Sequence, residues 1–302
     1  MTPALEIARE LPPAGSSLEK SEQYTRWLAT RHYENFTVAT YVLPRKLRQH
    51  FYNIYAYCRW ADDLGDEIDD PVKSLELLDW WQVELEQCYT GAAKHPVFIA
   101  LRNTIGMFGI PMEPFAGLLT AFRRDQTVHR YPTWSSVLEY CRYSANPVGR
   151  LVLYLGGYSD SGRQTLADFT CTALQLANFW QDVARDLKKD RIYIPLELLV
   201  SHGLSESDLF ELVFDARYVQ LMRQLLERTR ELFHQGLPLA QSVERNLRVD
   251  IGLFSRCGLA VLDSIESIGY NTLQQRPTLS AATKLRLIGR ALGARALTYA
   301  RR

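Results

Sequence analysis

The sequence lacks any long hydrophobic run. Its longest apolar stretches, such as Leu151 to Leu155, are far shorter than the roughly 20 residues with which a helix crosses a bilayer. The first 20 residues contain several acids and no continuous apolar segment, so we expect no signal peptide. Basic and acidic residues nearly balance, at 35 and 34, and the net charge of +1 gives no indication of a nucleic-acid partner.

Cysteine motifs are missing as well. The five cysteines are scattered and none forms a CxxC pair, which argues against a zinc site and against a disulfide framework. Scattered cysteines of this kind are typical of a reducing compartment, and we expect a cytoplasmic protein. The phosphate-binding pattern GxxxxGK(S/T) is also absent, which counts against a P-loop enzyme.

Strand patterns are nearly absent, whereas helical spacing is widespread. Apolar residues recur at intervals of three and four, for instance from Leu75 to Tyr89. No repeat, low-complexity tract or change of composition separates one part of the chain from another. We therefore predict an all-α fold with a single domain over residues 21–302, preceded by a mobile segment over residues 1–20.

Six of the nine residues from Asp62 to Asp70 are acidic. Such a patch repels itself unless a cation neutralises it. The patch follows a largely apolar segment, and one helical face there would carry four polar side chains: Tyr55, Arg59, Asp62 and Asp66. This pattern is typical of a cation site, although a solvated helix end followed by a turn is an alternative.

A second polar line follows one face of a predicted helix: Gln175, Asn178, Asp182 and Asp186. Amide and carboxylate oxygens are the hard ligands that Mg²⁺ prefers. The apolar residues between them indicate a substantially buried helix, where an acid without a partner is costly. The alternative interpretation pairs these acids with the nearby basic residues Arg185, Lys188 and Lys189.

The two DxxxD patterns together indicate a shared binding site for metal and diphosphate, which neither pattern indicates alone. Asp62 and Asp182 are 120 residues apart, on separate predicted helices that a fold can place on opposite sides of a cavity. Facing carboxylate rows would hold Mg²⁺ and a diphosphate without a phosphate-binding loop. The chemistry of such a site is Lewis-acid assistance to a departing diphosphate, with aromatic ring faces stabilising the carbocation that remains.

Four blocks of this sequence resemble the squalene/phytoene synthase family. Residues 55–63 (YAYCRWADD) and the stretch from Leu174 to Tyr193 are similar to the two signatures of the family. Residues 140–149 (YCRYSANPVG) are similar to the segment between them, and residues 32–36 (HYENF) occupy the place of a short N-terminal motif. The resemblance implies an all-α isoprenoid-synthase fold with a central cavity and a Mg²⁺ cluster.

The resemblance also implies roles for individual residues. Metal and diphosphate binding would fall to Asp62, Asp66, Gln175, Asn178, Asp182 and Asp186. Contacts to diphosphate oxygens would come from Arg59 and Arg191. The reaction centre would be lined by Tyr55, Tyr140 and Tyr193. The hydrocarbon channel would be shaped by Phe36, Ala145, Val148, Gly149 and Leu174.

Two departures from the family pattern bear on the reaction. Members that join two prenyl diphosphates often carry Ser-Lys-Ser-Phe where this chain has Tyr33 to Phe36, so that Glu34 replaces a lysine. An arginine often precedes the first aspartate of the second motif, where this chain has Gln181. Fewer cations suit a reaction that holds one diphosphate rather than two.

The same blocks look most like the bacterial hydroxysqualene synthases of hopanoid pathways. This likeness implies ionisation of presqualene diphosphate and capture of the cation by water to give hydroxysqualene, with no requirement for NADPH. The alternatives are a condensing synthase that makes presqualene diphosphate, squalene or phytoene, and a terpene cyclase of related fold. A non-catalytic helical assembly protein is an alternative of another class, although it would be expected to lose the motif carboxylates, which are all present.

The end of the sequence is basic. From Arg276 onward it contains seven basic residues and no acids, with leucines and an isoleucine between them. One interpretation is an amphipathic terminal helix with a solvated basic face. The other is loose attachment to the inner, anionic face of a membrane, which would suit a lipid-soluble product.

Overall fold

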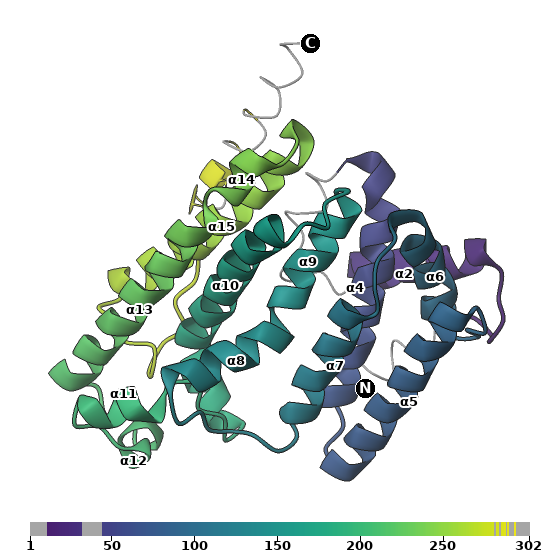
Figure 1. The fold of residues 1–302 in the computed structure, drawn as a ribbon. Coiled ribbons are helices and arrows are strands. Elements are labelled where there is room, and N and C mark those ends of the chain that lie inside the picture. Colours follow the sequence, from purple (N-terminus) through teal and green to yellow (C-terminus); the bar gives the residue numbers. More distant parts are fainter. Residues whose placement is uncertain are drawn as a thin grey trace. The chain divides into compact units, whose positions relative to one another are not determined.

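The computed structural model describes residues 11–31 and 44–280, together with a few positions between 282 and 293. Every regular element in these residues is a helix, and their one β contact is an isolated bridge between Arg130 and Ile192. The prediction of an all-α fold is therefore confirmed (Figure 1). None of the described helices is long and apolar enough to cross a membrane.

The helices group into two compact units, which we describe separately. The first unit comprises residues up to 127 together with 150–159, and the second comprises 128–149 together with the residues from 160 onward. Helix α9 (Asn146–Leu155) has residues in both ranges. The single domain over residues 21–302 stays a prediction.

The first unit is built around α4. Its helices are α2 (Leu18–Arg31), α4 (Arg45–Asp66), α5 (Pro71–Thr90), α6 (Pro96–Phe108) and α7 (Glu113–Arg124). Helix α4 packs against each of the other four. The sequence fixes the helix ends locally, since Asp70 caps the first turn of α5 and proline opens both α5 and α6.

The core of the first unit is aromatic. Tyr57 of α4 is completely buried, and its hydroxyl donates a hydrogen bond of 2.9 Å to the carbonyl of Phe115. Trp60, one turn further along α4, stacks on Trp81 with ring centroids 5.4 Å apart. His95 packs edge-on against both tryptophans. These contacts fix the rotation of α4, and hence the face on which its acidic end lies.

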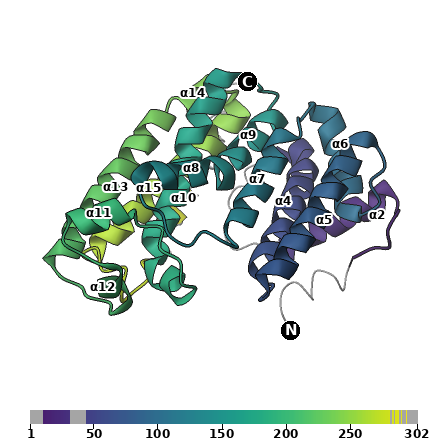
Figure 2. The ribbon, with the colours of Figure 1, turned by 60° about the horizontal axis from the view of Figure 1, so that its bottom comes forward.

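The second unit is built around α10. Its helices are α8 (Trp134–Ser144), α10 (Ser161–Lys188), α11 (Leu196–Ser201), α12 (Glu206–Phe210), α13 (Ala216–Gly236), α14 (Leu239–Ser242) and α15 (Arg245–Ser267). Helices α13 and α15 run beside α10 in Figures 1 and 2 and make the most extensive contacts with it. Helix α10 is thus held along one side over most of its length.

Glycines allow these helices to approach closely. A Cβ atom at Gly236 of α13 would lie 2.2 Å from Thr170 Oγ1 of α10, and one at Gly258 of α15 would lie 2.2 Å from a ring carbon of Phe233. On the same buried side of α10, the indole of Trp180 donates a 2.9 Å hydrogen bond to Thr229 Oγ1. Packing therefore turns the opposite, polar face of α10 away from this core.

Candidate active site

The first acidic row lies in the last turns of α4. Asp62 is about half exposed (48% of its side chain), and Asp66, the last residue of the helix, is exposed. The last turn of α4 contains no basic residue. Carboxylates at a helix C-terminus are unfavourable because the helix dipole places negative charge there. Asp66, the last residue of α4, therefore does not stabilise the helix through its dipole.

Asp63, which the sequence analysis did not assign a role, is the buried acid of this motif. Its side chain is only 3% exposed and pairs with Arg59 at 2.5 Å, measured from Oδ1 to Nη2. Burial raises the pKa of the Asp63 carboxyl to about 7, against the opposing effect of Arg59. Asp62 Oδ2 lies 3.7 Å from the same guanidinium. Asp63 thus anchors Arg59, and Asp62 lies beside it. The i, i+4 spacing between Arg59 and Asp63 is the sequence pattern that could have predicted this ion pair.

Tyr55 belongs to the same stripe. It is half-buried on α4, and burial raises the pKa of its phenol to about 12. Its electrostatic environment is set mainly by Arg59 and Asp62, which places the tyrosine on the side of α4 that carries these residues. Tyr55, Arg59 and Asp62 therefore lie on one side of α4, as the sequence pattern predicted, and Asp66 lies one turn further along the same helix.

The second polar row lies on α10. All four of its residues are in this helix: Gln175, Asn178, Asp182 and Asp186. Asn178 is exposed and the other three are half-buried, whereas Ala177 and Trp180 on the other side are buried. The row is therefore accessible to a ligand along three turns. The expectation of substantial burial holds for the apolar side of α10 and not for this row.

The end of α10 brings three predicted site residues together. After Lys188 the chain turns back, with Asp190 in the left-handed region at φ 55°, and the backbone N–H of Arg191 donates to the carbonyl of Asp186 at 2.9 Å. Asp186, Arg191 and Tyr193 then line one cavity of about 10 Å³. This volume holds one water at most, so the cavity marks where the three side chains meet rather than a space for a hydrocarbon chain.

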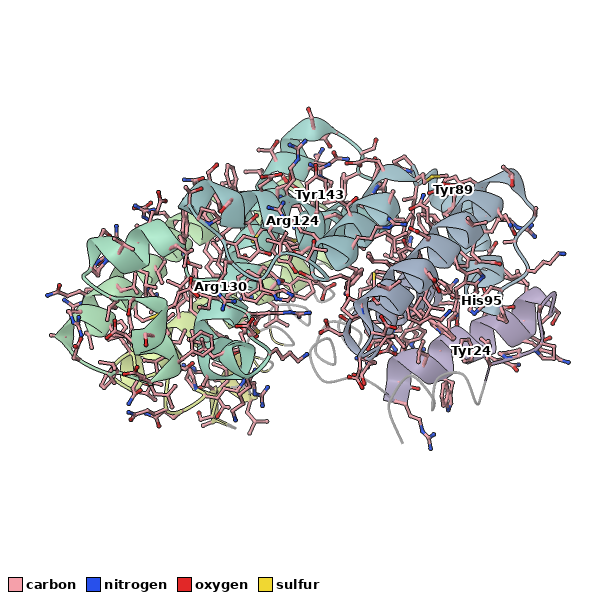
Figure 3. All side chains as sticks on the ribbon, turned by 90° about the horizontal axis from the view of Figure 1, so that it is seen from below. Tyr24, Tyr89, His95, Arg124, Arg130 and Tyr143 are labelled. Carbon is pink, nitrogen blue, oxygen red and sulfur yellow. The ribbon has the colours of Figure 1, made fainter. Side chains whose placement is uncertain are left out.

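Arg130 fixes this turn, a role that the sequence analysis missed. Its guanidinium forms ion pairs with Asp190 at 2.6 Å and with Glu206 at 2.7 Å, and it also donates to the carbonyl of Asp190. At the isolated bridge beside it, the backbone N–H of Ile192 donates a hydrogen bond of 2.9 Å to the carbonyl of His129. Figure 3 labels Arg130. No local pattern links position 130 to position 190, because the contact spans 60 residues.

Tyr140 and Tyr193 belong to one aromatic cluster. Tyr193 stacks face to face on Phe179 of α10, with ring centroids 3.7 Å apart and planes 4° from parallel. The ring centroid of Tyr193 lies 5.8 Å from that of Tyr140 of α8 and 5.5 Å from that of Tyr131. The structure thus groups two of the predicted tyrosines and adds Phe179 and Tyr131, which the sequence analysis did not single out.

The residues predicted to shape a hydrocarbon channel have a packing role in the structure. A Cβ atom at Gly149 would lie 2.5 Å from Cys171 Sγ of α10, so the contact between α9 and α10 already requires a glycine there. Ala145 is buried, and Val148 is half-buried. Leu174 lies against α15, where a Cβ atom at Gly258 would come within 2.9 Å of it. Lining of a channel by these residues stays a prediction.

Some predicted features lie outside the described residues. Phe36 and the rest of residues 32–43 are among them, as are residues 1–10 of the N-terminal segment. Of the seven basic residues at the end of the chain, the structure describes only Arg276 and Arg286. The roles of Phe36 and Glu34, and membrane attachment of the C-terminal segment, stay predictions.

Arg276 is a further residue that the sequence analysis did not place in the site. Its guanidinium contacts both carboxylate oxygens of Asp182, and the distance from Nη2 to Oδ2 is 3.0 Å. Arg185, one turn further along α10, lies 3.7 Å from the same carboxylate. A cation is therefore present beside Gln181, although not at position 181 itself. The absence of an arginine at position 181 therefore does not leave Asp182 without a neighbouring cation.

The donor chemistry of both rows fits Mg²⁺. In the described part of the chain, no three His, Cys, Asp or Glu side chains lie together closely enough to hold a metal ion by themselves. Mg²⁺ usually keeps several waters and is bound by one or two carboxylates plus substrate phosphates, so it does not require such a cluster. The pairing of Asp182 with a guanidinium also shows that this carboxylate attracts a cation. Each row can supply carboxylate oxygens of this kind.

Comparisons with known proteins show where similar sequences and folds occur. The family model described as squalene/phytoene synthase matches residues 29–283. The hydroxysqualene synthase of Rhodopseudomonas palustris is 35% identical over 217 residues, which cover 71% of this chain and 73% of that protein. The 15-cis-phytoene synthase of Synechococcus elongatus is 28% identical over 282 residues, covering 89% and 92%. The crystal structure of squalene synthase HpnC from Alicyclobacillus acidocaldarius is 42% identical, with a TM-score of 0.81 over 84% of this chain and 96% of that one.

Proposed function

Since the chain belongs to the squalene/phytoene synthase family, we propose that it ionises presqualene diphosphate and captures the resulting cation with water. The products would be hydroxysqualene and diphosphate. The family consists of isoprenoid synthases, and identity is higher to a hydroxysqualene synthase (35%) than to a phytoene synthase (28%). This difference in identity is our reason for choosing this reaction within the family, which is what the comparisons themselves show.

The observation that carries the proposal is the polar row of α10 together with the turn that follows it. Amide and carboxylate side chains extend along three turns of the helix, and at their end Asp186 meets Arg191 and Tyr193 around one cavity. Carboxylate, guanidinium and phenol side chains in this order suit the binding of a metal–diphosphate complex beside an aromatic surface.

In the proposed reaction, both acidic rows would bind Mg²⁺ and through it the diphosphate. The residues concerned are Asp62, Asp66, Gln175, Asn178, Asp182 and Asp186. Bound Mg²⁺ would supply Lewis-acid stabilisation of the departing diphosphate. Arg59 and Arg191 would bind diphosphate oxygens, with Asp63 orienting the first guanidinium and Arg130 fixing the turn that carries the second.

The aromatic cluster would act on the carbocation. The rings of Tyr140, Phe179 and Tyr193 lie within one group in the second unit. The negative ring faces attract a cation, and this attraction contributes about 2 kcal/mol or more where water is excluded. A cation that persists near these rings can be captured by water at one carbon. We also propose that the reaction needs no NADPH, since the product of water capture is not reduced.

A condensing reaction is the second candidate. It is favoured by the likeness to the 15-cis-phytoene synthase of Synechococcus elongatus, which covers most of both chains. Arg276 beside Asp182 also adds a cation that a second diphosphate could use. A non-catalytic role is disfavoured because Asp62, Asp66, Asp182 and Asp186 are all present.

A product analysis tests the proposal. The purified protein would be incubated with Mg²⁺ and either presqualene or farnesyl diphosphate, with and without NADPH, in ¹⁸O-labelled water. We expect ¹⁸O-labelled hydroxysqualene from presqualene diphosphate alone, with an unchanged yield when NADPH is added. Consumption of farnesyl diphosphate with no turnover of presqualene diphosphate would refute the proposal and establish the condensing alternative.

A further inference from the structure

The segment at Arg276 and Pro277 is held across the second DxxxD motif. Arg276 donates to both oxygens of Asp182, through Nε to Oδ1 and through Nη2 to Oδ2. Gln181, the residue just before Asp182, donates from its side-chain amide to the carbonyl of Pro277 at 2.7 Å. The carbonyl oxygen of the same amide lies 3.4 Å from Arg276 Nη2. Two adjacent residues of α10 therefore bind two adjacent residues that lie 94 to 96 positions further along the chain.

The surroundings make this contact stronger than an ordinary surface ion pair. The side chain of Asp182 is 23% exposed and that of Arg276 is 34% exposed, so both charges are partly withdrawn from water. Gln181 is buried, at 7% exposure. An arginine that meets both oxygens of a carboxylate forms the bidentate arrangement, which is stronger than a single charged hydrogen bond. The preceding turn is anchored independently, because Thr272 bonds to the buried Tyr218 at 2.8 Å.

The contact occupies the atoms that the proposed metal site needs. Mg²⁺ binds carboxylate oxygens at about 2.0–2.1 Å. A guanidinium on both oxygens of Asp182 would then lie close to the metal ion, and two cations at such a distance repel each other. Binding of Mg²⁺ to Asp182 and pairing of Asp182 with Arg276 are therefore competing states of the same carboxylate.

We propose that Arg276 is a resident counter-cation of Asp182 that Mg²⁺ must displace, so that metal binding to α10 releases the Arg276–Pro277 segment. Gln181 is the positioning residue of this device, because it holds the segment against the helix. Competition is reciprocal, so the segment weakens Mg²⁺ binding by the same factor by which Mg²⁺ weakens the segment. This inference rests on the proposed role of Asp182 in binding Mg²⁺.

The first test measures Mg²⁺ binding without substrate. Isothermal titration of the whole protein with Mg²⁺ would compare the wild type with Arg276→Gln and Asp182→Asn. We expect Arg276→Gln to bind Mg²⁺ at least about fivefold more tightly, since fivefold corresponds to about 1 kcal/mol, the upper value for an exposed ion pair, and this pair is partly buried. Asp182→Asn should bind Mg²⁺ more weakly than the wild type.

Arg185→Gln is the matched control. Arg185 lies 3.7 Å from the same carboxylate oxygen of Asp182. In the described part of the chain its side chain has no hydrogen bond to Gln181 or Pro277. Its replacement therefore removes one nearby charge and leaves the Arg276–Pro277 segment in place. We expect its Mg²⁺ affinity to change by less than about twofold, because its side chain is 66% exposed and its charge is screened by water. An equal gain in both arginine variants would overturn the inference in favour of a general charge effect.

The second test follows the segment itself. Hydrogen–deuterium exchange of the peptide over residues 271–280 would be measured with and without Mg²⁺. We expect Mg²⁺ to accelerate exchange of this peptide in the wild type. In Arg276→Gln, and in Gln181→Met, exchange should be fast already without Mg²⁺. Gln181→Met keeps the size of the buried side chain but removes both of its hydrogen bonds.

The outcomes separate this inference from the proposed function. If the wild type binds Mg²⁺ through Asp182 but Arg276→Gln binds it with the same or lower affinity, the displacement is refuted and the metal site stands. Unchanged exchange of residues 271–280 on Mg²⁺ binding would also refute it. If Asp182→Asn binds Mg²⁺ as the wild type does, Asp182 is not a ligand, and both the inference and this part of the proposed function are wrong.

Discussion

Burial of His95 predicts how the stability of the first unit depends on pH. This unit carries the first acidic row. Its imidazole is only 7% exposed and lies among the rings of Trp60, Trp81 and Phe98. Its Nδ1 atom accepts a hydrogen bond of 3.3 Å from the backbone N–H of Val97, and so caps α6. Burial lowers the pKa of His95 from 6.5 to about 4.

The sign of the pH dependence follows from this shift. Between pH 6.5 and pH 4 the unfolded chain protonates its histidine while the folded protein keeps His95 neutral. The unfolded state therefore binds more protons, and the free energy of unfolding falls as the pH falls through this window. A difference of about 2.5 pKa units corresponds to a loss of about 3 kcal/mol by pH 4.

The assay compares the wild type with His95→Asn, whose side chain retains a capping oxygen but does not titrate. Urea unfolding would be followed by the fluorescence of the buried tryptophans at several pH values from 7 to 4. We expect the wild type to lose about 3 kcal/mol more stability than the variant over this range. Parallel curves for the two proteins would refute the assignment of a neutral, buried His95. Comparing differences also removes the contribution of Asp63, whose raised pKa acts in the opposite direction.

The remaining predictions concern the second unit and the end of the chain. Asp182→Ala should abolish turnover, by at least about a thousandfold, while helical circular dichroism and the melting temperature stay close to those of the wild type. Arg130→Gln should lower kcat/KM by about tenfold with stability nearly unchanged, because the turn that carries Arg191 loses its ion pairs; rescue by Arg130→Lys to near the wild-type rate would contradict this role for the bidentate guanidinium. Gly258→Val should reduce the free energy of unfolding by about 3 kcal/mol, measured by urea denaturation, since its side chain would overlap the Phe233 ring. If the C-terminal basic segment binds anionic membranes, liposome co-sedimentation should decrease with added salt, and binding that is insensitive to salt would count against it.

The sequence predicted the helical architecture because its signals are local. Apolar spacing of three and four residues is a property of neighbouring positions, and it predicted the all-α class and a helix along the polar row that lies on α10. The same reasoning predicted that Tyr55, Arg59, Asp62 and Asp66 share one face of a helix, and all four lie on α4. The family resemblance added an order of blocks, which the match over residues 29–283 supports.

Local patterns were less informative about what individual side chains do. Gly149 was predicted to shape a channel, which stays a prediction; that Cys171 of α10 packs beside it is revealed only by the packing of two helices. Asp63 was overlooked beside Asp62, because the two differ in burial and not in chemistry. Gln181 was interpreted as a missing cation, whereas its amide holds a segment that brings one.

Local sequence patterns and tertiary packing therefore determine different features of this protein. The sequence by itself determined which residues lie on one helix and share its face, because a helix repeats every 3.6 residues whatever surrounds it. Only the tertiary structure decided which distant residues complete those faces. Arg130 reaches Asp190 across 60 positions and Arg276 reaches Asp182 across 94. Such contacts depend on how α10 packs against its neighbours, and no periodicity in the chain encodes that packing.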